Sequence, residues 1–170
     1  MYKQVLKCLE GYEKVLDIGC GSGWFARKCI EAGHCYIGVD YSTEAIEAAR
    51  EAAPEAIFYE IDIAKDQEII KSEDFDIVVF ISFLEHIHND LEVLEAIPLQ
   101  KPVIFVVPNR LSKGHIRAFR SAEKVFKRYG QIIEFNKVFK MQGNRWIDWV
   151  ISGIRLPDGG EFDFEVQEVK

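Results

Sequence analysis

Val15-Leu16-Asp17-Ile18-Gly19-Cys20-Gly21-Ser22-Gly23 is the segment that decides the fold. A short apolar run ends in glycines at every second position, and residues 22–32 then repeat apolar side chains with a helical period. Glycine lets a chain turn tightly and approach a ligand closely. A helix that starts there presents free N–H groups and the positive end of its dipole. The segment therefore predicts a strand, a ligand-binding turn and a helix.

The same alternation of strand and helix continues along the chain. Apolar runs predict strands at 14–18, 35–39, 56–61, 75–81 and 102–107, and helical patterns cover 22–32, 43–53, 65–72, 90–97 and 115–129. Two more runs, at 131–140 and 145–154, flank Gly143-Asn144 as a hairpin would, and 161–169 suggests one more strand. This order predicts an α/β fold with a doubly wound, mostly parallel seven-stranded sheet and an antiparallel edge hairpin. We expect residues 1–170 to form a single domain.

The composition excludes several classes of protein. The chain has 170 residues, of which 48% are hydrophobic and 29% charged, as in an ordinary globular domain. It has no apolar run near the about 20 residues of a membrane span, and its first residues lack the apolar core of a signal peptide. The four cysteines form no Cys-x-x-Cys pair, which argues against a zinc ribbon. We therefore expect a reduced, cytoplasmic protein.

Acidic residues end the next two predicted strands. Ligands of doubly wound sheets bind at the carboxyl ends of the strands, where the strand order reverses. Asp40 closes the second strand and Asp62 follows the third, and a carboxylate can accept two hydrogen bonds from a ribose diol. A nicotinamide cofactor is one candidate ligand. Its G-x-G-x-x-G fingerprint is opposed by Trp24 at the third glycine position and by Asp17 inside the strand.

The pattern D-x-G-x-G-x-G resembles the first motif of the class I S-adenosylmethionine-dependent methyltransferases. The resemblance extends over residues 13–130, and it implies a Rossmann-like fold with S-adenosylmethionine as the cofactor. In that family the first acid helps to bind the methionine amino group of the cofactor, the second binds its ribose and the third its adenine. The residues implied to bind the cofactor are Asp17, Gly19, Cys20, Gly21, Gly23, Asp40, Tyr41, Asp62 and Ile63. A glycine turn without a ligand and a solvated acid at position 62 are the alternatives.

Leu84-Glu85-His86 follows the fourth strand and resembles the quinone- and small-molecule-methylating branch of this family. His86 and His115 are candidate catalytic bases, because imidazole can take up a proton near neutral pH. Alternatively, they pack near the cofactor without moving a proton. Some relatives hold a divalent ion through Glu-x-x-Glu-His and a later histidine. Ser82 replaces the first glutamate of that pattern, so we expect no metal.

The methyl acceptor is less well defined. The chain lacks the Asn/Asp-Pro-Pro-Tyr/Phe signature after its fourth strand, which argues against an exocyclic-amine or glutamine methylase. Residues 101–145 hold 11 Lys and Arg against 2 Asp and Glu, a net charge of +9 in a chain of net charge −7. On a helix over 115–129, five cations would form one stripe: Arg117, Arg120, Lys124, Lys127 and Arg128. The stripe predicts an anionic acceptor, such as RNA, or else a solvated outer face.

We therefore predict methyl transfer from S-adenosylmethionine to a small-molecule or RNA acceptor. Relatives that enclose small hydrophobic substrates usually carry a lid, and the sequence shows little chain before the first strand and no insertion after the fifth. We expect an open site or a protein partner that completes it. Trp146 and Trp149 lie on opposite faces of one predicted strand, so we expect at least one to be exposed or at a substrate edge. The alternative function is a non-catalytic S-adenosylmethionine-binding subunit.

Overall fold

The computed structural model describes residues 1–142, 147–157 and 165–169. In this part of the chain, eight strands form one sheet. The strands are β1 (Lys14–Ile18), β2 (Cys35–Asp40), β3 (Ile57–Glu60), β4 (Ile77–Ile81), β5 (Pro102–Pro108), β6 (Ile133–Gln142), β7 (Ile147–Arg155) and β8 (Val166–Val169). The helices are α1 (Tyr2–Cys8), α2 (Trp24–Glu31), α3 (Thr43–Ala52), α4 (Glu68–Ser72), α5 (Asp90–Glu95) and α6 (Ala122–Tyr129).

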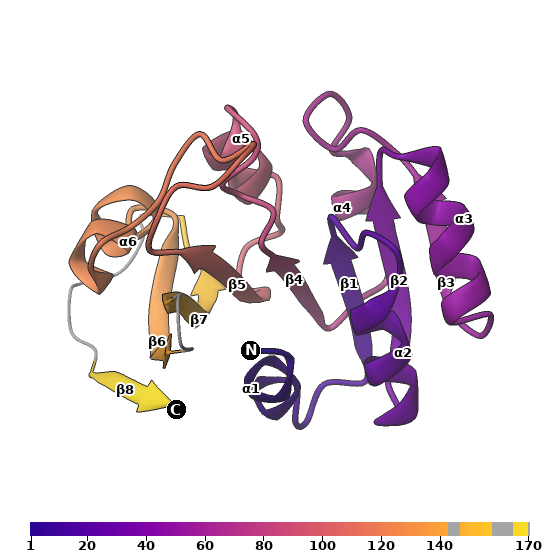
Figure 1. Cartoon of the computed structure of the whole chain (residues 1–170), viewed down its shortest axis with the longest axis horizontal. Helices are drawn as coiled ribbons and strands as arrows, with labels where there is room; N and C mark the ends of the chain where they lie inside the picture. The colour runs from indigo at the N-terminus through magenta and orange to yellow at the C-terminus, as the bar shows by residue number, and fades with distance from the viewer. Residues whose placement is uncertain (143–146, 158–164, 170) are drawn as a thin grey trace.

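The strand order is β3-β2-β1-β4-β5-β7-β6-β8 (Figure 1). Strands β1 to β5 are parallel, whereas β7 lies antiparallel between β5 and β6. The predicted α/β class with a mostly parallel sheet and an antiparallel hairpin is thus confirmed. The sheet has eight strands rather than the seven predicted for it. The eighth, β8, lies within the run 161–169 that suggested one more strand, and it pairs with the outer edge of β6. The expected turn at Gly143-Asn144 and the side chain of Trp146 lie outside the described residues.

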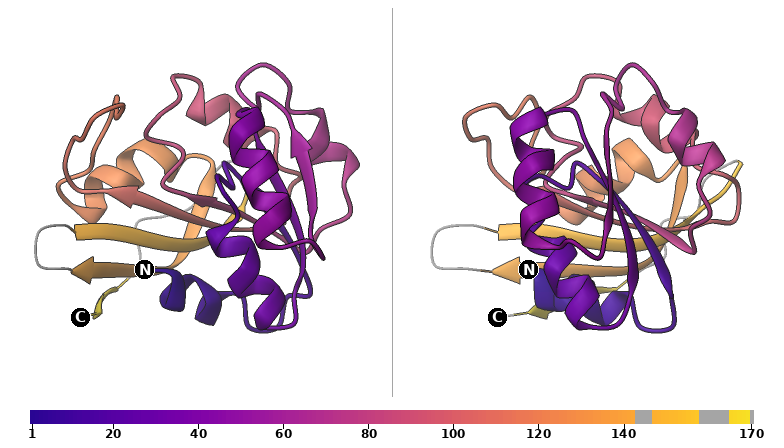
Figure 2. Two further views of the ribbon diagram at one scale, coloured as in Figure 1. Left: turned by 45° about the vertical axis from the view of Figure 1, so that its right-hand side comes forward. Right: turned by 90° about the vertical axis from the view of Figure 1, so that its right-hand side faces the viewer.

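Two hydrophobic cores, one on each face of the sheet, hold the helices in place. Helices α1, α2 and α3 pack on one face through side chains such as Val5, Phe25 and Ile46. Helices α4, α5 and α6 pack on the other through side chains such as Ile70 and Leu94. Figure 2 shows α3 and α5 on opposite sides of the strands. The central parallel strands β4 and β5 are buried on both faces, which explains their nearly continuous apolar sequences.

Helix α1 was not predicted. Its signal is nonetheless in the sequence, because Tyr2, Val5 and Leu9 share one helical face, and Val5 and Leu9 are fully buried. Within the described part of the chain, none of the helices combines the length and the apolar character that crossing a bilayer requires.

The prediction of one helix over 115–129 is wrong, and with it the single basic stripe. Helix α6 begins only at Ala122, and residues 115–121 are irregular. Tertiary hydrogen bonds use backbone groups that a helix would need, because Phe119 N donates to Pro108 O (2.8 Å) and the indole of Trp149 donates to Phe119 O (2.7 Å). Trp149 is buried, and because Trp146 lies outside the described residues, the expectation that at least one of the two is exposed stays a prediction.

The five cations of the expected stripe consequently have different surroundings. The guanidinium groups of Arg117 and Arg128 pair with the buried Asp90. Arg120, Lys124 and Lys127 are exposed, but they no longer continue one helical face. The observation on which the RNA prediction depended is thus absent from the described fold.

Candidate functional site

A cavity of about 560 Å³ opens at the carboxyl ends of the parallel strands. It lies where the strand order reverses, since β1 pairs with β2 on one side and with β4 on the other. Its volume is in the range of small-molecule sites. The lining includes six of the predicted site residues: Gly19, Asp40, Tyr41, Asp62, Ile63 and His86. The other six lining residues were not predicted to belong to the site: Val39, Ile61, Ser82, Phe83, Ile87 and Gly114.

Hydrogen bonds fix the glycine loop to the end of β2. The backbone N–H groups of Gly19 and Cys20 both donate to Val39 O, at 2.8 and 3.0 Å. Gly19 needs to be glycine for two reasons: its φ is +81°, and an added Cβ would lie 2.3 Å from the ring of Phe83. The loop therefore lies tightly between β2 and the turn after β4, and leaves the cavity open above it.

Asp40 connects this loop to the next helix. Its Oδ2 accepts from Gly21 N and its Oδ1 from Ser42 N, both at 3.0 Å. Ser42 caps α3 by accepting from Ala45 N. Each Asp40 oxygen keeps a lone pair for a further donor, so the carboxylate can still bind a ligand in the cavity that it lines.

Asp62 and Ile63 form the wall contributed by the loop after β3. Asp62 accepts from Ala64 N (3.2 Å) and pairs with Lys65 Nζ (2.6 Å), and this Lys65 contact keeps the pKa of the carboxyl below its usual value. The side chain of Ile63 is buried and packs against the core. An ionised acid next to an apolar surface suits a flat heteroaromatic ring with an amino group.

Four predicted loop residues do not line the cavity: Asp17, Cys20, Gly21 and Gly23. Asp17 is buried beneath the loop, where it accepts a hydrogen bond from the hydroxyl of Tyr36. Its Oδ1 makes no hydrogen bond in the described part of the chain, and burial raises the pKa of Asp17 to about 7. Cys20 is also buried. Gly23 has a φ of +76° and lies against α3, so its role in the fold is packing.

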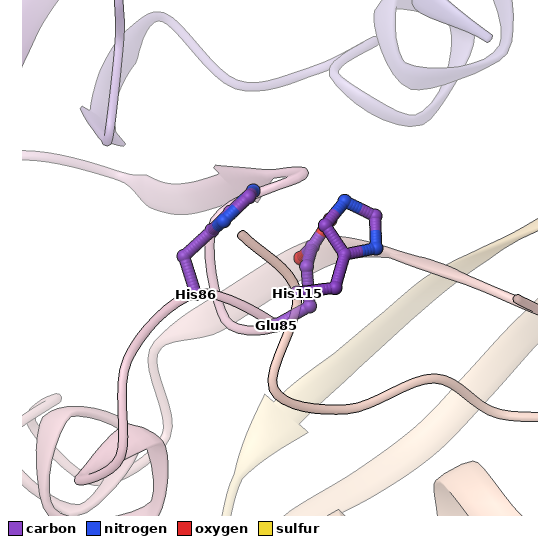
Figure 3. Close-up of side chains that lie close together, drawn as sticks. All are labelled: Glu85, His86 and His115. Atoms are coloured by element: carbon purple, nitrogen blue, oxygen red, sulfur yellow. The ribbon is translucent and has the colours of Figure 1, made fainter. Parts of the chain in front are cut away.

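Three ionisable side chains form a cluster (Figure 3), and one of them, His86, lines the cavity. Glu85 and His86 come from the turn after β4, and His115 comes from the segment after β5. Ligand atoms of the three residues lie within 4.8 Å of one another. The two imidazole rings meet edge to face, with centroids 4.9 Å apart. The structure therefore brings the two predicted histidines together and adds Glu85, which the sequence analysis did not assign to the site.

The polar atoms of this cluster are poorly satisfied within the protein. Neither carboxylate oxygen of the buried Glu85 bonds to another described residue, and His115 Nδ1 is buried without a partner among them. Burial raises the pKa of Glu85 to about 7, and the nearby Asp148 carboxylate acts in the same direction. Unsatisfied buried polar atoms are rare and call for a ligand, an ion or a water. The cluster could hold a divalent cation through these three residues, or it could accept a proton.

Comparison with known proteins supports the assignment of this cavity. A family model described as "Methyltransferase domain" matches residues 15–98. The chain is 32% identical over 126 residues to the ubiquinone biosynthesis O-methyltransferase of Actinobacillus pleuropneumoniae serotype 5b, and 33% identical over 122 residues to that of Thiobacillus denitrificans. Each alignment covers 68% of this chain, but only 54% and 53% of the relatives. The chain thus spans about half the length of the curated relatives it matches.

Solved structures share the fold. The N-methyltransferase NodS of Bradyrhizobium japonicum, crystallised with S-adenosylhomocysteine, superposes with a TM-score of 0.72 at 17% identity, covering 91% of this chain and 85% of that one. The magnesium protoporphyrin IX methyltransferase of Synechocystis, also with S-adenosylhomocysteine, gives a TM-score of 0.69 at 15% identity, covering 91% and 81%.

The sequence motif, the sheet order, the position of the cavity and these relatives agree with one another. The glycine loop after β1 and the acids that end β2 and follow β3 lie within the matched family segment. The chain belongs to the class I S-adenosylmethionine-dependent methyltransferases.

Proposed function

We propose that this protein transfers the methyl group of S-adenosylmethionine to an oxygen atom of a small-molecule acceptor. The observation that carries the proposal is that one cavity is lined by Gly19, Asp40 and Asp62 and also by His86, which belongs to the Glu85–His86–His115 cluster. One end of this cavity suits a nucleoside, and the other holds groups that can take up a proton. The relatives named as O-methyltransferases favour an oxygen acceptor.

The residues present fit the proposed cofactor. Asp40 would accept the ribose hydroxyls, and Asp62 would accept from the adenine amino group while Ile63 packs on the ring. The Gly19 backbone would let the methionine portion pass close to the loop. Asp17 would support the ammonium end, and Cys20, Gly21, Gly23 and Tyr41 would complete the binding loops. When bound, the cofactor supplies an electrophilic methyl group on a sulfonium sulfur.

The chain's own contribution to the reaction is orientation and proton removal. In-line attack requires the acceptor oxygen to be held close to the methyl carbon. As the new O–C bond forms and the S–C bond breaks, the hydroxyl proton must leave the acceptor. We propose that the histidines of the cluster take up this proton. His115 Nδ1 could accept it, because this nitrogen has no hydrogen-bond partner among the described residues. The buried Glu85 would stabilise the resulting imidazolium.

A divalent cation is a second use of the same cluster, favoured by the three converging ligand atoms and by the unsatisfied oxygens of Glu85. Glu85, His86 and His115 would hold the ion, which would lower the pKa of an acceptor hydroxyl bound to it. Titration calorimetry with Mn²⁺ and Zn²⁺ tests this use. We expect binding that is lost in His115→Ala, whereas equal binding in the variant would assign the ion to another site.

The proposed reaction is tested with methyl-labelled S-adenosylmethionine and a panel of phenols, catechols and aliphatic alcohols. We expect label in at least one phenol or catechol, and we expect His86→Ala and His115→Ala to lose most of it. Asp40→Ala serves as the cofactor-site control. Binding of S-adenosylhomocysteine without transfer to any acceptor, including those in fractionated cell extract, would support the non-catalytic binding subunit instead.

A groove after β5 suggests that the protein prefers a negatively charged acceptor. The groove has a volume of about 450 Å³ and combines the cations Arg110 and Arg120 with the exposed apolar side chains Leu111 and Ile116. We propose that this groove receives an acceptor with both an anionic and an apolar part. Replacing Arg110 and Arg120 by glutamine should raise the KM of an anionic acceptor and leave S-adenosylhomocysteine affinity unchanged.

A further inference from the structure

The Glu85–His86–His115 cluster is assembled from two loops that are far apart in sequence, so something must hold these loops together. Backbone contacts do part of this: Ile116 N donates to Glu85 O (2.9 Å), and His86 Nδ1 lies 3.1 Å from Gly114 O. Residues 84–88, here called the 84–88 turn, carry no regular helix or strand. A turn of this kind keeps its shape only where outside contacts fix it.

The side chain of Arg117 supplies such contacts. One terminal nitrogen of its guanidinium donates to Leu84 O and to Ile87 O (2.6 Å), and the other lies 3.4 Å from His88 O. These main-chain carbonyls lie on both sides of Glu85 and His86. The Arg117 side chain is 14% exposed, which is low for an arginine. A single planar group thus spans the turn that carries two of the three cluster residues.

Asp90 pairs with the terminal nitrogen of Arg117 that also donates to two carbonyls of the 84–88 turn. Its carboxylate is fully buried and lies 3.1 Å from Arg117. Arg128 bonds the same carboxylate through Nε (2.7 Å) and a terminal nitrogen (2.5 Å), and the hydroxyl of Tyr129 donates to it at 2.8 Å. Among the described hydrogen bonds, those of Arg128 include none to the 84–88 turn. The two arginines therefore share a partner but differ in what else they touch.

We infer that Arg117 is a positioning residue, which holds the 84–88 turn so that Glu85 and His86 face His115. Lysine cannot replace it, because an ammonium is a compact donor without the planar fork that reaches several carbonyls and a carboxylate at once. The catalytic consequence of this inference rests on the proposed methyl transfer. The geometric consequence, which is that Arg117 maintains the spacing of the Glu85–His86–His115 cluster, does not depend on the proposed methyl transfer.

Arg128 provides a matched control. Arg117→Gln and Arg128→Gln each remove one cation beside the buried Asp90, and loss of one partner from such a pair is destabilising in either case. Only the change at Arg117 removes contacts to the 84–88 turn. Arg117→Lys keeps the charge and is the variant to use if Arg117→Gln does not fold.

The readout is the nuclear Overhauser effect between the ring protons of His86 and His115. The chain has only four histidines, so selective histidine labelling gives a simple spectrum. We expect the effect in the wild type and in Arg128→Gln, and its loss in folded Arg117→Gln and Arg117→Lys. We also expect hydrogen exchange at the Ile116 amide to rise by about tenfold or more in the Arg117 variants.

Two outcomes would overturn the inference: an unchanged ring-to-ring effect in a folded Arg117 variant, or an equal loss in Arg128→Gln. Binding of S-adenosylhomocysteine to the wild type is measured in the same samples. If it fails to bind, the proposed function fails, while the ring-to-ring effect still decides the role of Arg117. If it binds, the Arg117→Lys variant should keep its affinity within about threefold and lose methyl transfer to the acceptor identified for the wild type.

Discussion

Asp40 serves both the fold and the ligand site. Its two oxygens accept backbone N–H groups from the glycine loop and from the start of α3, so that two segments of the site depend on one carboxylate. Because it also lines the cavity, a bound ribose would use the lone pairs that the backbone leaves. The consequences of losing Asp40 are therefore both local disorder of the loop and loss of a ligand contact.

We predict that Asp40→Ala weakens S-adenosylhomocysteine binding by about 1–3 kcal/mol, because polar groups of the loop and of the ligand lose their acceptor. Titration calorimetry measures the change. Asp66→Ala is the matched control, since Asp66 is an exposed acid that does not line the cavity. An unchanged dissociation constant in folded Asp40→Ala would mean that this carboxylate serves only the turn.

Asp17 predicts a pH dependence of stability. Burial raises the pKa of its carboxyl in the folded protein from 3.8 to about 7, so the folded state binds this proton more tightly than the unfolded state does. The stabilising contribution is therefore complete below about pH 4 and is lost as the pH rises to about 7, by an amount on the order of 2–4 kcal/mol.

Denaturant unfolding of the wild type and of Asp17→Asn, from about pH 5 to about pH 8, measures this contribution. We expect the free energy of unfolding to fall with pH more steeply in the wild type, because the variant has no proton to lose at this position. Glu85 adds to the slope in both proteins and cancels in the difference, since burial raises its pKa to about 7 as well. Parallel slopes would show that Asp17 is ionised in the folded state.

At the scale of helices and strands, the sequence predicted those elements whose conformation depends mainly on their own residues. Each parallel strand is a short apolar run, and the turn after β1 needs glycine at positions of positive φ, as at Gly19 and Gly23. The acids that line the cavity could be predicted for the same reason, since they directly end or follow strands. The order of the strands then determines which other loops lie next to these acids in the fold.

The elements that were missed depend on contacts between distant segments. Residues 115–121 have a helical apolar pattern, yet the buried Arg117 and the Phe119 backbone bond to the turn after β4 and to β5 and β7. Of the Glu85–His86–His115 cluster, only Glu85 was missed. His86 and His115 were predicted as candidate bases, but only the packing of the segment after β5 brings His115 beside Glu85. Because Ser82 replaces the first glutamate of the metal-binding pattern, nothing in the sequence assigned Glu85 to the site.

Packing between α2 and α3 gives a prediction at this scale. A Cβ at Gly23 would lie 2.8 Å from the backbone of Ala49 in α3, whereas at Gly33 nothing lies within 4 Å. Both glycines have a positive φ, so alanine should cost about 1–2 kcal/mol at either position. Gly23→Ala should cost clearly more, because the helices must also separate. Thermal unfolding compares the two variants, and equal losses would show that the helix contact is not tight.

On the scale of the whole molecule, the two-sided sheet explains where the chemistry is. Helices α1 to α3 cover one face and α4 to α6 the other, so both faces are closed by apolar packing. The ends of the strands remain for ligands, and the reversal of strand order between β1 and β4 separates the loops there. The proposed nucleoside side lies at the loops after β1, β2 and β3, and the proposed acceptor side at those after β4 and β5.

The central claim is that this cavity binds S-adenosylmethionine and its product. Thermal unfolding with S-adenosylhomocysteine, and with NAD as the competing ligand of the fold, tests it most directly. A ligand of the folded state at 100 times its dissociation constant adds about 2.7 kcal/mol to the free energy of unfolding. We predict a rise in Tm with S-adenosylhomocysteine that Asp40→Ala reduces, and none with NAD. No rise at about millimolar S-adenosylhomocysteine, or an equal rise with NAD, would contradict the account.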